Sequence, residues 1–479
     1  MKYLIPLYIF FGLHLAKAQT LEITAQKILA TYPAYLETSI KDRRFKHEEI
    51  VPLLKTLSNK PGFEVSVAGQ SVEGRDIYLV RAGTGPVKVL LWSQMHGDEP
   101  TATMAMMDVF NFLADAGGPL DEWRQLLLKD LSLYFIPMLN PDGAERFQRR
   151  NALDIDLNRD AVRQQTPEAR LLKQIRDSLQ ADWGFNLHDQ SRYYSAGRSG
   201  QTASFSFLAP AYNTKKDINE VRLRSIRLIA NLDQLIEQYL PGRIGRYDDE
   251  FEARAFGDNM QKWGTSTILI ESGGLPNDPE KQELRRYHYL LLLSAFEAIR
   301  SESYAQYTKE DYFLIPENKR LLHDLIIREA SWQKDGQTYL IDLAFRQIER
   351  LYNGARLVYY EGRLTDLGDL STFSGYEELD ASDMLLQAGK MHPRIFFDLK
   401  ELQRSDNYRN MLAQGYTDVR LQRMPPKEIA AQQPLKLHPA DTKKANNELH
   451  LNGNPSLLLV KGGEVQYAIV NGRLFELAK

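Results

Sequence analysis

The sequence predicts an α/β fold in which a doubly wound mixed sheet has helices on both faces and is followed by a smaller, mainly β C-terminal domain. Two observations lead to this prediction. Between about residues 21 and 300, short apolar runs alternate with longer segments of helical composition, which is typical of strand–helix folds. After about Tyr304, short β-type segments are separated by turn residues such as Asn471-Gly472.

The expected elements of the first part follow one another in a regular order. Residues 21–57 have helical composition, and two neighbouring strands at 62–67 and 76–80 are joined by a turn. Residues 87–92 form a continuous apolar run, as expected for a strand covered on both faces, and Pro100 suits the first turn of the next helix. Further helices are expected at 102–113, 121–129, 166–179, 217–240 and 278–300, strands at 131–137, 183–187 and 267–270, and a turn at 140–143.

The C-terminal part is expected to contain short strands joined by tight turns. These strands are expected at 357–360, 395–398, 457–461, 464–470 and 473–477. The histidines of this part have no ligand spacing, and we interpret them as structural or surface residues: His323, His392, His438 and His450.

The composition is that of an ordinary soluble protein. The chain has 479 residues, 43% of them hydrophobic and 26% charged, and its formal net charge of −3 gives no indication of a nucleic-acid partner. It contains no cysteine, which excludes disulfides and thiolate ligands. Any metal must therefore be bound by His, Asp or Glu.

The first residues have the pattern of a secretory leader. Lys2 precedes a mostly apolar stretch at 3–15, and Ala16-Lys17-Ala18 fits a cleavage site, so residues 1–18 are expected to be a signal peptide. The alternative is an N-terminal membrane anchor, but the apolar stretch is shorter than the roughly 20 residues that a span needs. We therefore expect a secreted or periplasmic protein whose mature chain has no transmembrane span.

Imidazole and carboxylate side chains follow the ends of several expected strands. His96 and Glu99 come after the first of these strands, and His188 and Glu271 come directly after two others. Open α/β sheets bind their ligands at the carboxyl ends of strands, so these side chains are expected to meet. An isolated His-x-x-Glu is usually a surface turn, but the recurrence favours a zinc site of two histidines and one glutamate, with Glu271 as the acid–base group.

An arginine-rich segment, residues 149–160 (RRNALDIDLNRD), lies between the strands that carry these ligands. Two guanidinium sites beside an amide can hold a carboxylate through paired, charge-assisted hydrogen bonds. An isolated segment of this kind would usually be a solvated face. Its position between two ligand-bearing strands favours a substrate site instead.

Several motifs occur in a fixed order along the chain. They are Ser71-Val72-Glu73-Gly74-Arg75, His96-x-x-Glu99, Pro137-Met138-Leu139-Asn140-Pro141-Asp142-Gly143, Arg149 with Asp156-Leu157-Asn158-Arg159, His188, and Ile270-Glu271-Ser272. This ordered set, over about residues 21–300, resembles the zinc metallocarboxypeptidases of peptidase family M14. The resemblance implies a zinc carboxypeptidase-like fold at residues 19–304, one Zn²⁺ per chain, and an accessory domain of unknown role at 305–479.

The resemblance also implies a role for each matching residue near the metal. His96, Glu99 and His188 would bind zinc, and Glu271 would act as general base and general acid. Asp156 would orient His96, as a zinc-bound imidazole usually requires.

Other matching residues would hold the substrate. Arg149 would polarise the scissile carbonyl and stabilise the oxyanion, with Arg150 as the alternative for this role. Asn158 and Arg159 would hold the terminal carboxylate of the substrate.

The segment at 246–259 departs from the pattern of the animal enzymes in this family. Tyr247 could be the mobile tyrosine that covers the bound substrate, or it could be an exposed loop residue. Arg254 could favour an acidic side chain in the pocket for the released residue, or it could pair with Asp249 or Glu252.

The predicted function is a secreted zinc-dependent metallocarboxypeptidase that hydrolyses the C-terminal bond of peptides, with cell-wall (peptidoglycan-derived) peptides as a candidate substrate class. One alternative is a zinc-dependent deacylase of N-acyl amino acids, because that related chemistry uses the same zinc and carboxylate-binding motifs. The other is a non-catalytic binding protein with an inherited zinc pocket. No nucleic-acid partner is expected.

Overall fold

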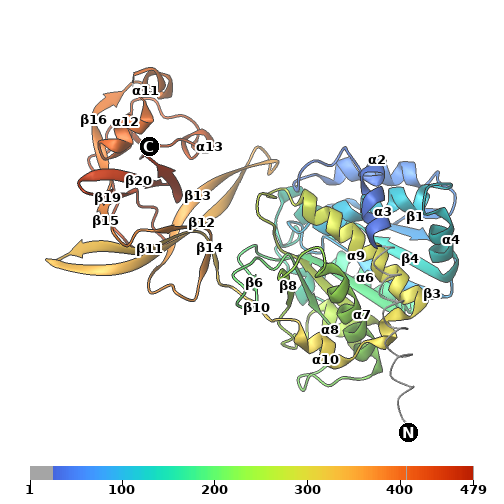
Figure 1. Ribbon diagram of the computed structural model, residues 1–479. Helices are drawn as coiled ribbons and strands as arrows, with labels where there is room; N and C mark the ends of the chain where they lie inside the picture. The colour runs from blue at the N-terminus through green and yellow to red at the C-terminus, as the bar shows by residue number, and fades with distance from the viewer. Residues whose placement is uncertain (1–24, 406, 478–479) are drawn as a thin grey trace, which may run out of the picture. The chain divides into compact units, whose positions relative to one another are not determined.

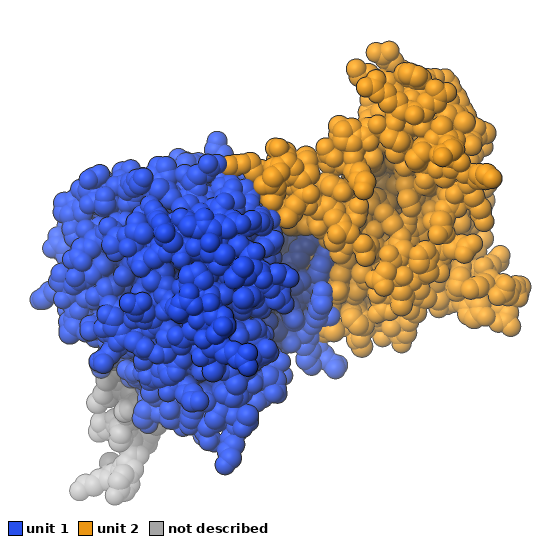
Figure 2. All heavy atoms as spheres, turned by 180° about the vertical axis from the view of Figure 1, so that it is seen from behind, with its two compact units in different colours: residues 1–320 blue, residues 321–479 orange. Residues whose placement is uncertain are grey.

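The computed structural model describes residues 25–405 and 407–477 (Figure 1). They form two compact units, of which the first ends at Arg320 and the second begins at Leu321 (Figure 2). The signal peptide expected at residues 1–18 lies outside the described residues. Within the described ranges, no helix is both long enough and apolar enough to cross a bilayer.

An eight-stranded mixed sheet lies at the centre of the first unit, in the order β1-β2-β4-β3-β5-β9-β7-β8. Its central strands β4, β3, β5 and β9 are parallel, whereas β2 and β7 run antiparallel to their neighbours in this central set. The mixed-sheet α/β fold expected from the sequence is thereby confirmed. The strands of this sheet are β1 (Phe63–Gln70), β2 (Asp76–Ala82), β3 (Val87–Trp92), β4 (Leu131–Ile136), β5 (Trp183–Asp189), β7 (Phe205–Leu208), β8 (Ile244–Arg246) and β9 (Ser266–Ser272).

Helices pack on both faces of the sheet because side chains alternate along its central strands. Val89 and Leu91 of β3 lie in the core beneath α3, α7 and α9, whereas Leu90 and Trp92 lie in the core beneath α6 and α8. All four side chains are fully buried, which explains the continuous apolar run. The helices of this unit are residues 25–35, α2 (His47–Leu57), α3 (Thr101–Ala114), α4 (Asp121–Asp130), α5 (Pro141–Arg146), α6 (Pro167–Leu179), α7 (Glu220–Ile236), α8 (Phe256–Lys262), α9 (Gln282–Ser301) and α10 (Lys309–Leu314).

Two segments differ in detail from the expectation. The helical segment expected at 21–57 is interrupted, because residues 36–46 separate the helix at 25–35 from α2. The turn expected at 140–143 is the beginning of α5. Asn140 Oδ1 accepts the backbone N–H of Gly143 at 2.9 Å, so residues with a strong turn preference act here as a helix cap.

The first unit extends beyond the boundary that the sequence suggested between residues 304 and 305. Tyr312 of α10 is fully buried in the main core of this unit. Asn318, in the short strand β10 (Asn318–Lys319), donates to Gln190 Oε1 at 2.7 Å and accepts from Ser206 Oγ at 2.8 Å. Buried packing and hydrogen bonds therefore attach residues 305–320 to the first unit, which a change in composition does not reveal.

The second unit is mainly β. One sheet has the order β13-β12-β11-β15-β19-β20-β21, with β14 pairing with β11, and another contains β16, β17 and β18. The meander expected near the C-terminus is formed by β19, β20 and β21. The elements are β11 (Leu322–Lys334), β12 (Gln337–Tyr352), β13 (Leu357–Gly368), β14 (Ser374–Asp380), β15 (Leu385–Ala388), β16 (Lys390–Phe396), α11 (Leu399–Ser405), α12 (Tyr408–Ala413), β17 (Tyr416–Leu421), α13 (Lys427–Ala430), β18 (Lys436–Pro439), β19 (Leu457–Lys461), β20 (Glu464–Val470) and β21 (Arg473–Glu476).

A fully buried ion pair joins α3 to α9. Arg285 donates to Asp108 through Nε at 2.6 Å and through a terminal nitrogen at 2.5 Å. The guanidinium group also donates to the carbonyl oxygens of Glu37 and Ile40 at 3.0 and 2.8 Å. These contacts satisfy the buried charge and attach the N-terminal segment to two helices of the same sheet face.

We predict that Asp108→Asn lowers the free energy of unfolding of the first unit by about 3–5 kcal/mol, because Arg285 would keep its charge without a buried counter-charge. Urea unfolding followed by tryptophan fluorescence measures this loss. The matched control is the double variant Asp108→Leu with Arg285→Met, which removes both charges and is expected to lose less stability. An Asp108→Asn protein as stable as the wild type would contradict the prediction.

Candidate metal centre and active site

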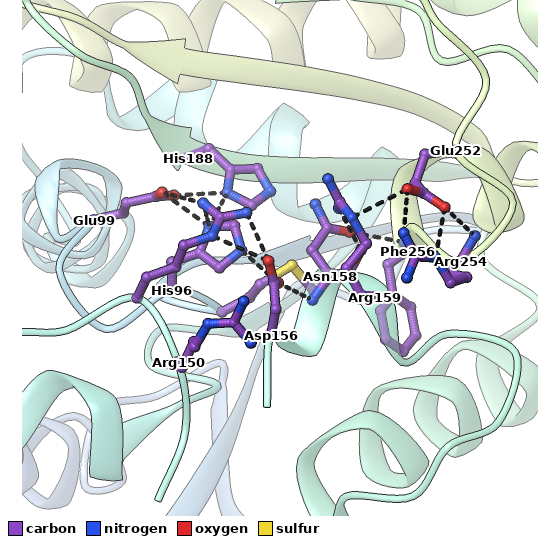
Figure 3. Close-up of polar contacts among 12 residues, drawn as sticks. His96, Glu99, Arg150, Asp156, Asn158, Arg159, His188, Glu252, Arg254 and Phe256 are labelled. Carbon is purple, nitrogen blue, oxygen red and sulfur yellow. Dashed lines mark hydrogen bonds and ion pairs between the residues drawn. The ribbon is translucent and has the colours of Figure 1, made fainter. Parts of the chain in front are cut away.

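His96, Glu99 and His188 form one buried cluster, and their potential ligand atoms all lie within 4.8 Å of one another (Figure 3). Glu99 Oε1 is 2.9 Å from Nδ1 of His96, and Oε2 is 2.7 Å from Nδ1 of His188. The two Nδ1 atoms are 3.1 Å apart. The structure thus brings together the three residues that the sequence analysis selected as zinc ligands.

Strand order explains this convergence. His188 lies near the carboxyl end of β5, whose parallel neighbour β3 leads into the loop that carries His96 and Glu99. Gly97 lets this loop lie against the start of α5, because a Cβ at Gly97 would be 2.0 Å from the carbonyl carbon of Gly143. A side chain at Gly97 would therefore displace the loop.

The cluster has the chemistry of a site for a divalent cation. Two imidazole nitrogens and a carboxylate point to a common centre, and this donor set suits zinc. Burial opposes a positive charge on His96, but the charge of Glu99 and the hydrogen bond with Asp156 raise the pKa of His96 to about 9. The surroundings therefore favour positive charge at this place, and the residues present fit a bound zinc ion.

Asp156 connects His96 to Arg149. Its Oδ1 atom is 3.1 Å from Nε2 of His96. Oδ2 accepts from Nε of Arg149 at 3.1 Å and lies 3.0 Å from a terminal nitrogen of the same guanidinium group. Burial alone would raise the pKa of Asp156, but His96 and Arg149 lower it, so the group is ionised. Because a carboxylate only accepts hydrogen bonds, Nε2 of His96 is the donor, and Nδ1 would offer its lone pair to a metal ion that replaces its proton.

Arg149, rather than Arg150, contacts the cluster. A terminal nitrogen of Arg149 is 3.1 Å from Nδ1 of His96 and 3.4 Å from Oε1 of Glu99. Arg150 instead donates to the backbone carbonyl of Asp154 at 2.9 Å. The guanidinium group of Arg149 is therefore placed to interact with a group bound at the cluster.

Glu271 lies beside His188, because β9 is the next parallel strand and pairs Glu271 with His188. Its side chain is buried, and among the described residues no hydrogen bond engages its carboxylate. Burial and the negative charge of Glu99 raise the pKa of Glu271 well above its ordinary value. The chain thus holds a second carboxylate close to the cluster but outside its set of ligand atoms.

Asn158 and Arg159, which are expected to hold a substrate carboxylate, lie on the side of Asp156 that faces away from Glu99 (Figure 3). Asn158 Oδ1 accepts from the backbone N–H of Phe256 at 2.8 Å, at the start of α8. Arg159 pairs with Glu252 at 3.2 Å. Arg254 also pairs with Glu252, at 2.8 Å, and its side chain is 61% exposed. This is one of the two pairings that the sequence left open for Arg254.

Tyr247 is half-buried and directly follows β8. Its backbone N–H donates to the carbonyl oxygen of Phe207 at 2.8 Å. The charge of Glu271, followed by burial, raises the pKa of Tyr247, which places the phenol within electrostatic range of that carboxylate. Tyr247 is therefore near the cluster rather than a fully exposed loop residue.

A buried polar network that the sequence does not predict adjoins the cluster, where the backbone N–H of Asp189 donates to Glu99 Oε2 at 3.2 Å. Asp189 Oδ2 accepts from Thr101 Oγ1 at 2.7 Å and from Lys281 Nζ at 3.0 Å. Lys281 also donates to the backbone carbonyl of Ser272 at 2.9 Å. Asp189 and Ser272 directly follow His188 and Glu271, and Thr101 lies two residues after Glu99. We call Thr101, Asp189, Ser272 and Lys281 the Asp189 network. No local sequence pattern marks Lys281, which is 92 residues from Asp189.

Comparison with known proteins gives matches to carboxypeptidases. The profile of the family described as zinc carboxypeptidase matches residues 50–219. A probable carboxypeptidase 2 of Arthroderma benhamiae is 26% identical over 188 residues, which cover 39% of this chain and 31% of that protein. The human carboxypeptidase N catalytic chain is 28% identical over 138 residues, which cover 24% and 30%. The chain thus spans about a third of the length of these relatives.

Among solved structures, a metallo-carboxypeptidase from Burkholderia cenocepacia aligns with 54% of this chain and 70% of its own, at 17% identity and a TM-score of 0.44. The segment matched by the family profile includes His96, Glu99, Arg149 and His188, whereas Glu271 lies beyond it. The similarity to the zinc carboxypeptidase family therefore lies in residues 50–219.

Proposed function

We propose that the first unit is a zinc-dependent carboxypeptidase that hydrolyses the C-terminal bond of peptides. The observation that carries this proposal is the convergence of His96, Glu99 and His188, with Glu271 beside them and outside the ligand set. A purely structural zinc site would be closed by four protein ligands. Three ligands with a separate buried carboxylate suit a catalytic site better.

In this proposal, His96 and His188 hold one zinc ion per chain through Nδ1, together with the carboxylate of Glu99. When bound in a site with an open ligand position, zinc lowers the pKa of water and polarises a carbonyl oxygen. Asp156 keeps His96 in the tautomer that presents Nδ1. Because Asp156 also binds Arg149, the same carboxylate orients the guanidinium group.

Glu271 is the proposed general base and general acid. Its carboxylate accepts a proton from the attacking water and then passes it to the nitrogen of the departing residue. An ordinary glutamate would be a weak base for this task, and the raised pKa of Glu271 makes both transfers easier near neutral pH.

Arg149 is proposed to donate to the oxygen of the scissile carbonyl, where negative charge develops. Asn158 and Arg159 are proposed to bind the terminal carboxylate of the substrate, and Tyr247 to cover it. Arg159 pairs with Glu252, so a substrate carboxylate would compete with Glu252 for the same guanidinium group. Arg254 would give a preference for acidic side chains only after leaving Glu252.

We further propose that the protein is exported, on the basis of the leader pattern at residues 1–18, and that cell-wall peptides are among its substrates. A deacylase acting on N-acyl amino acids would use the same metal ligands and the same carboxylate site. The two activities therefore differ in the acyl side of the bond, and a substrate comparison separates them.

We predict zinc-dependent release of C-terminal residues from peptides and its loss in Glu271→Gln. Replacing a general base typically costs about 10²–10⁴-fold in rate, so kcat/KM should fall by that order while zinc remains near one per chain. Residue release is measured across ordinary peptides, cell-wall peptides and N-acyl amino acids, with and without chelator, and metal content is measured alongside.

The control for this experiment is Glu122→Gln, which changes an exposed glutamate on α4 and should leave the rate unchanged. A Glu271→Gln protein with wild-type activity would disprove the assigned role. Hydrolysis of N-acyl amino acids with no action on peptides would favour the deacylase.

The Asp189 network leads to a second prediction, with Lys281 as a positioning residue. Lys281→Met removes the two hydrogen bonds through which its ammonium group links the side chain of Asp189 to the backbone of Ser272. We therefore expect zinc affinity to fall by about 10–100-fold, as for other groups that support metal ligands. Zinc affinity is measured by competition with a chromogenic chelator. Lys281→Arg should restore part of it, and Lys262→Met, at an exposed position on α8, is the control. A loss of thermal stability with unchanged zinc affinity would show that Lys281 is only structural.

A further inference from the structure

The second unit contains a cavity of about 480 Å³. It is lined by β13, by the segment at 424–437 that includes α13, and by the end of β20, and these elements are labelled in Figure 1. The volume lies in the range of small-molecule sites. No residue of the metal centre lines this cavity, so an inference about it is independent of the proposed peptidase.

One wall of the cavity is fixed by Asn471. Its side chain accepts from the backbone N–H of Gly362 at 2.7 Å and from Asn454 Nδ2 at 3.0 Å. It also donates to the carbonyl oxygens of Tyr360 and Ala431 at 2.8 and 3.0 Å. Four hydrogen bonds from one amide therefore join β13, the segment after α13 and the loop before β19, which gives the cavity a defined shape.

The charged groups of the lining are mainly cationic. Arg363, Lys427 and Lys436 line the cavity, and among the described residues no ion pair engages them. Glu361 is the acidic residue of the lining, and Arg350 binds its carboxylate at 2.6 Å. The cavity therefore has positive charge that no direct ion pair among the described residues neutralises, and Asp418 acts on Lys436 only electrostatically.

Lys436 and Asn454 carry the strongest indication of a ligand. The ammonium group of Lys436 donates to the backbone carbonyl of Asn454 at 2.5 Å, and burial lowers the pKa of Lys436. A bound anion would offset the free-energy cost of keeping this buried ammonium group charged. In addition, Asn454 Oδ1 is buried and accepts no hydrogen bond within the described part of the chain. This oxygen can accept a hydrogen bond from an ordered water or from a hydroxyl group of a ligand.

We propose that this cavity binds a small carboxylate that carries hydroxyl groups, a sugar acid in chemical class. The carboxylate would lie between Arg363 and Lys436, since guanidinium groups bind carboxylates through two parallel hydrogen bonds. A hydroxyl group would donate to Asn454 Oδ1. Leu435 and Val470 line the cavity too and offer apolar surface to the C–H groups of a sugar ring.

The test is calorimetric titration of the full chain with D-glucuronate, D-glucose and inorganic phosphate. We expect D-glucuronate to bind at millimolar concentration or better, D-glucose not to bind measurably, and phosphate to bind more weakly because it brings charge without the ring hydroxyls. Arg363→Gln and Lys436→Met should each weaken D-glucuronate binding by about 10-fold, the usual effect of removing one charge-assisted hydrogen bond.

Lys400→Gln is the matched control, because Lys400 is exposed on α11 of the same unit and does not line the cavity. Arg363 has no ion-pair partner in the described residues, so its replacement tests binding without breaking a contact that supports the fold. Thermal unfolding of each variant verifies this. The proposal is overturned if D-glucuronate does not bind, if D-glucose binds equally well, or if neither cavity variant weakens binding.

Discussion

The parallel pairing of β3, β5 and β9 is the constraint on which the candidate active site depends. In this pairing Glu271 lies next to His188, and the loop after β3 brings His96 and Glu99 to the same edge of the sheet. The three strands are buried on both faces, so a change in their register would also disrupt two hydrophobic cores. The geometry of the site is therefore set by the packing of the whole unit.

Electrostatic support comes from two sides of the cluster. Asp156 and Arg149 lie on one side, where a carboxylate fixes both a histidine and a guanidinium group. The Asp189 network lies behind the cluster and connects the elements that carry Glu99, His188 and Glu271. Burying this many charges without partners would cost desolvation free energy, and the hydrogen bonds on both sides of the cluster offset that cost. The same hydrogen bonds hold the neighbouring site residues in place.

The sequence predicted the elements whose local pattern is unambiguous. The strand at 87–92 is apolar at nearly every position, and Thr166 caps α6 as its sequence suggests. At Asn140 the same residue types suit a turn and a helix cap, and only packing of α5 against the loop at Gly97 decides between them. The role of Lys281 could not be predicted from the sequence, because it depends on contacts between residues that are distant in the chain.

Site residues were easier to predict than their partners. His96, Glu99 and His188 occur in a recurrent pattern at strand ends, so their convergence follows from the sheet topology. The pairing of Glu252 with both Arg159 and Arg254 depends instead on how the segment at 246–259 folds. In the second unit, alternation predicted strands, but the cavity arises from side chains of separate segments that no periodicity connects.

The most direct test of the central claim is a crystal structure of the protein with zinc, with diffraction data collected on both sides of the zinc absorption edge. The account predicts one strong anomalous peak at about 2.0–2.2 Å from Nδ1 of His96, Nδ1 of His188 and a carboxylate oxygen of Glu99, with Glu271 not bound to the metal. A peak at another place, or a zinc ion that takes Glu271 as a fourth protein ligand, would contradict it.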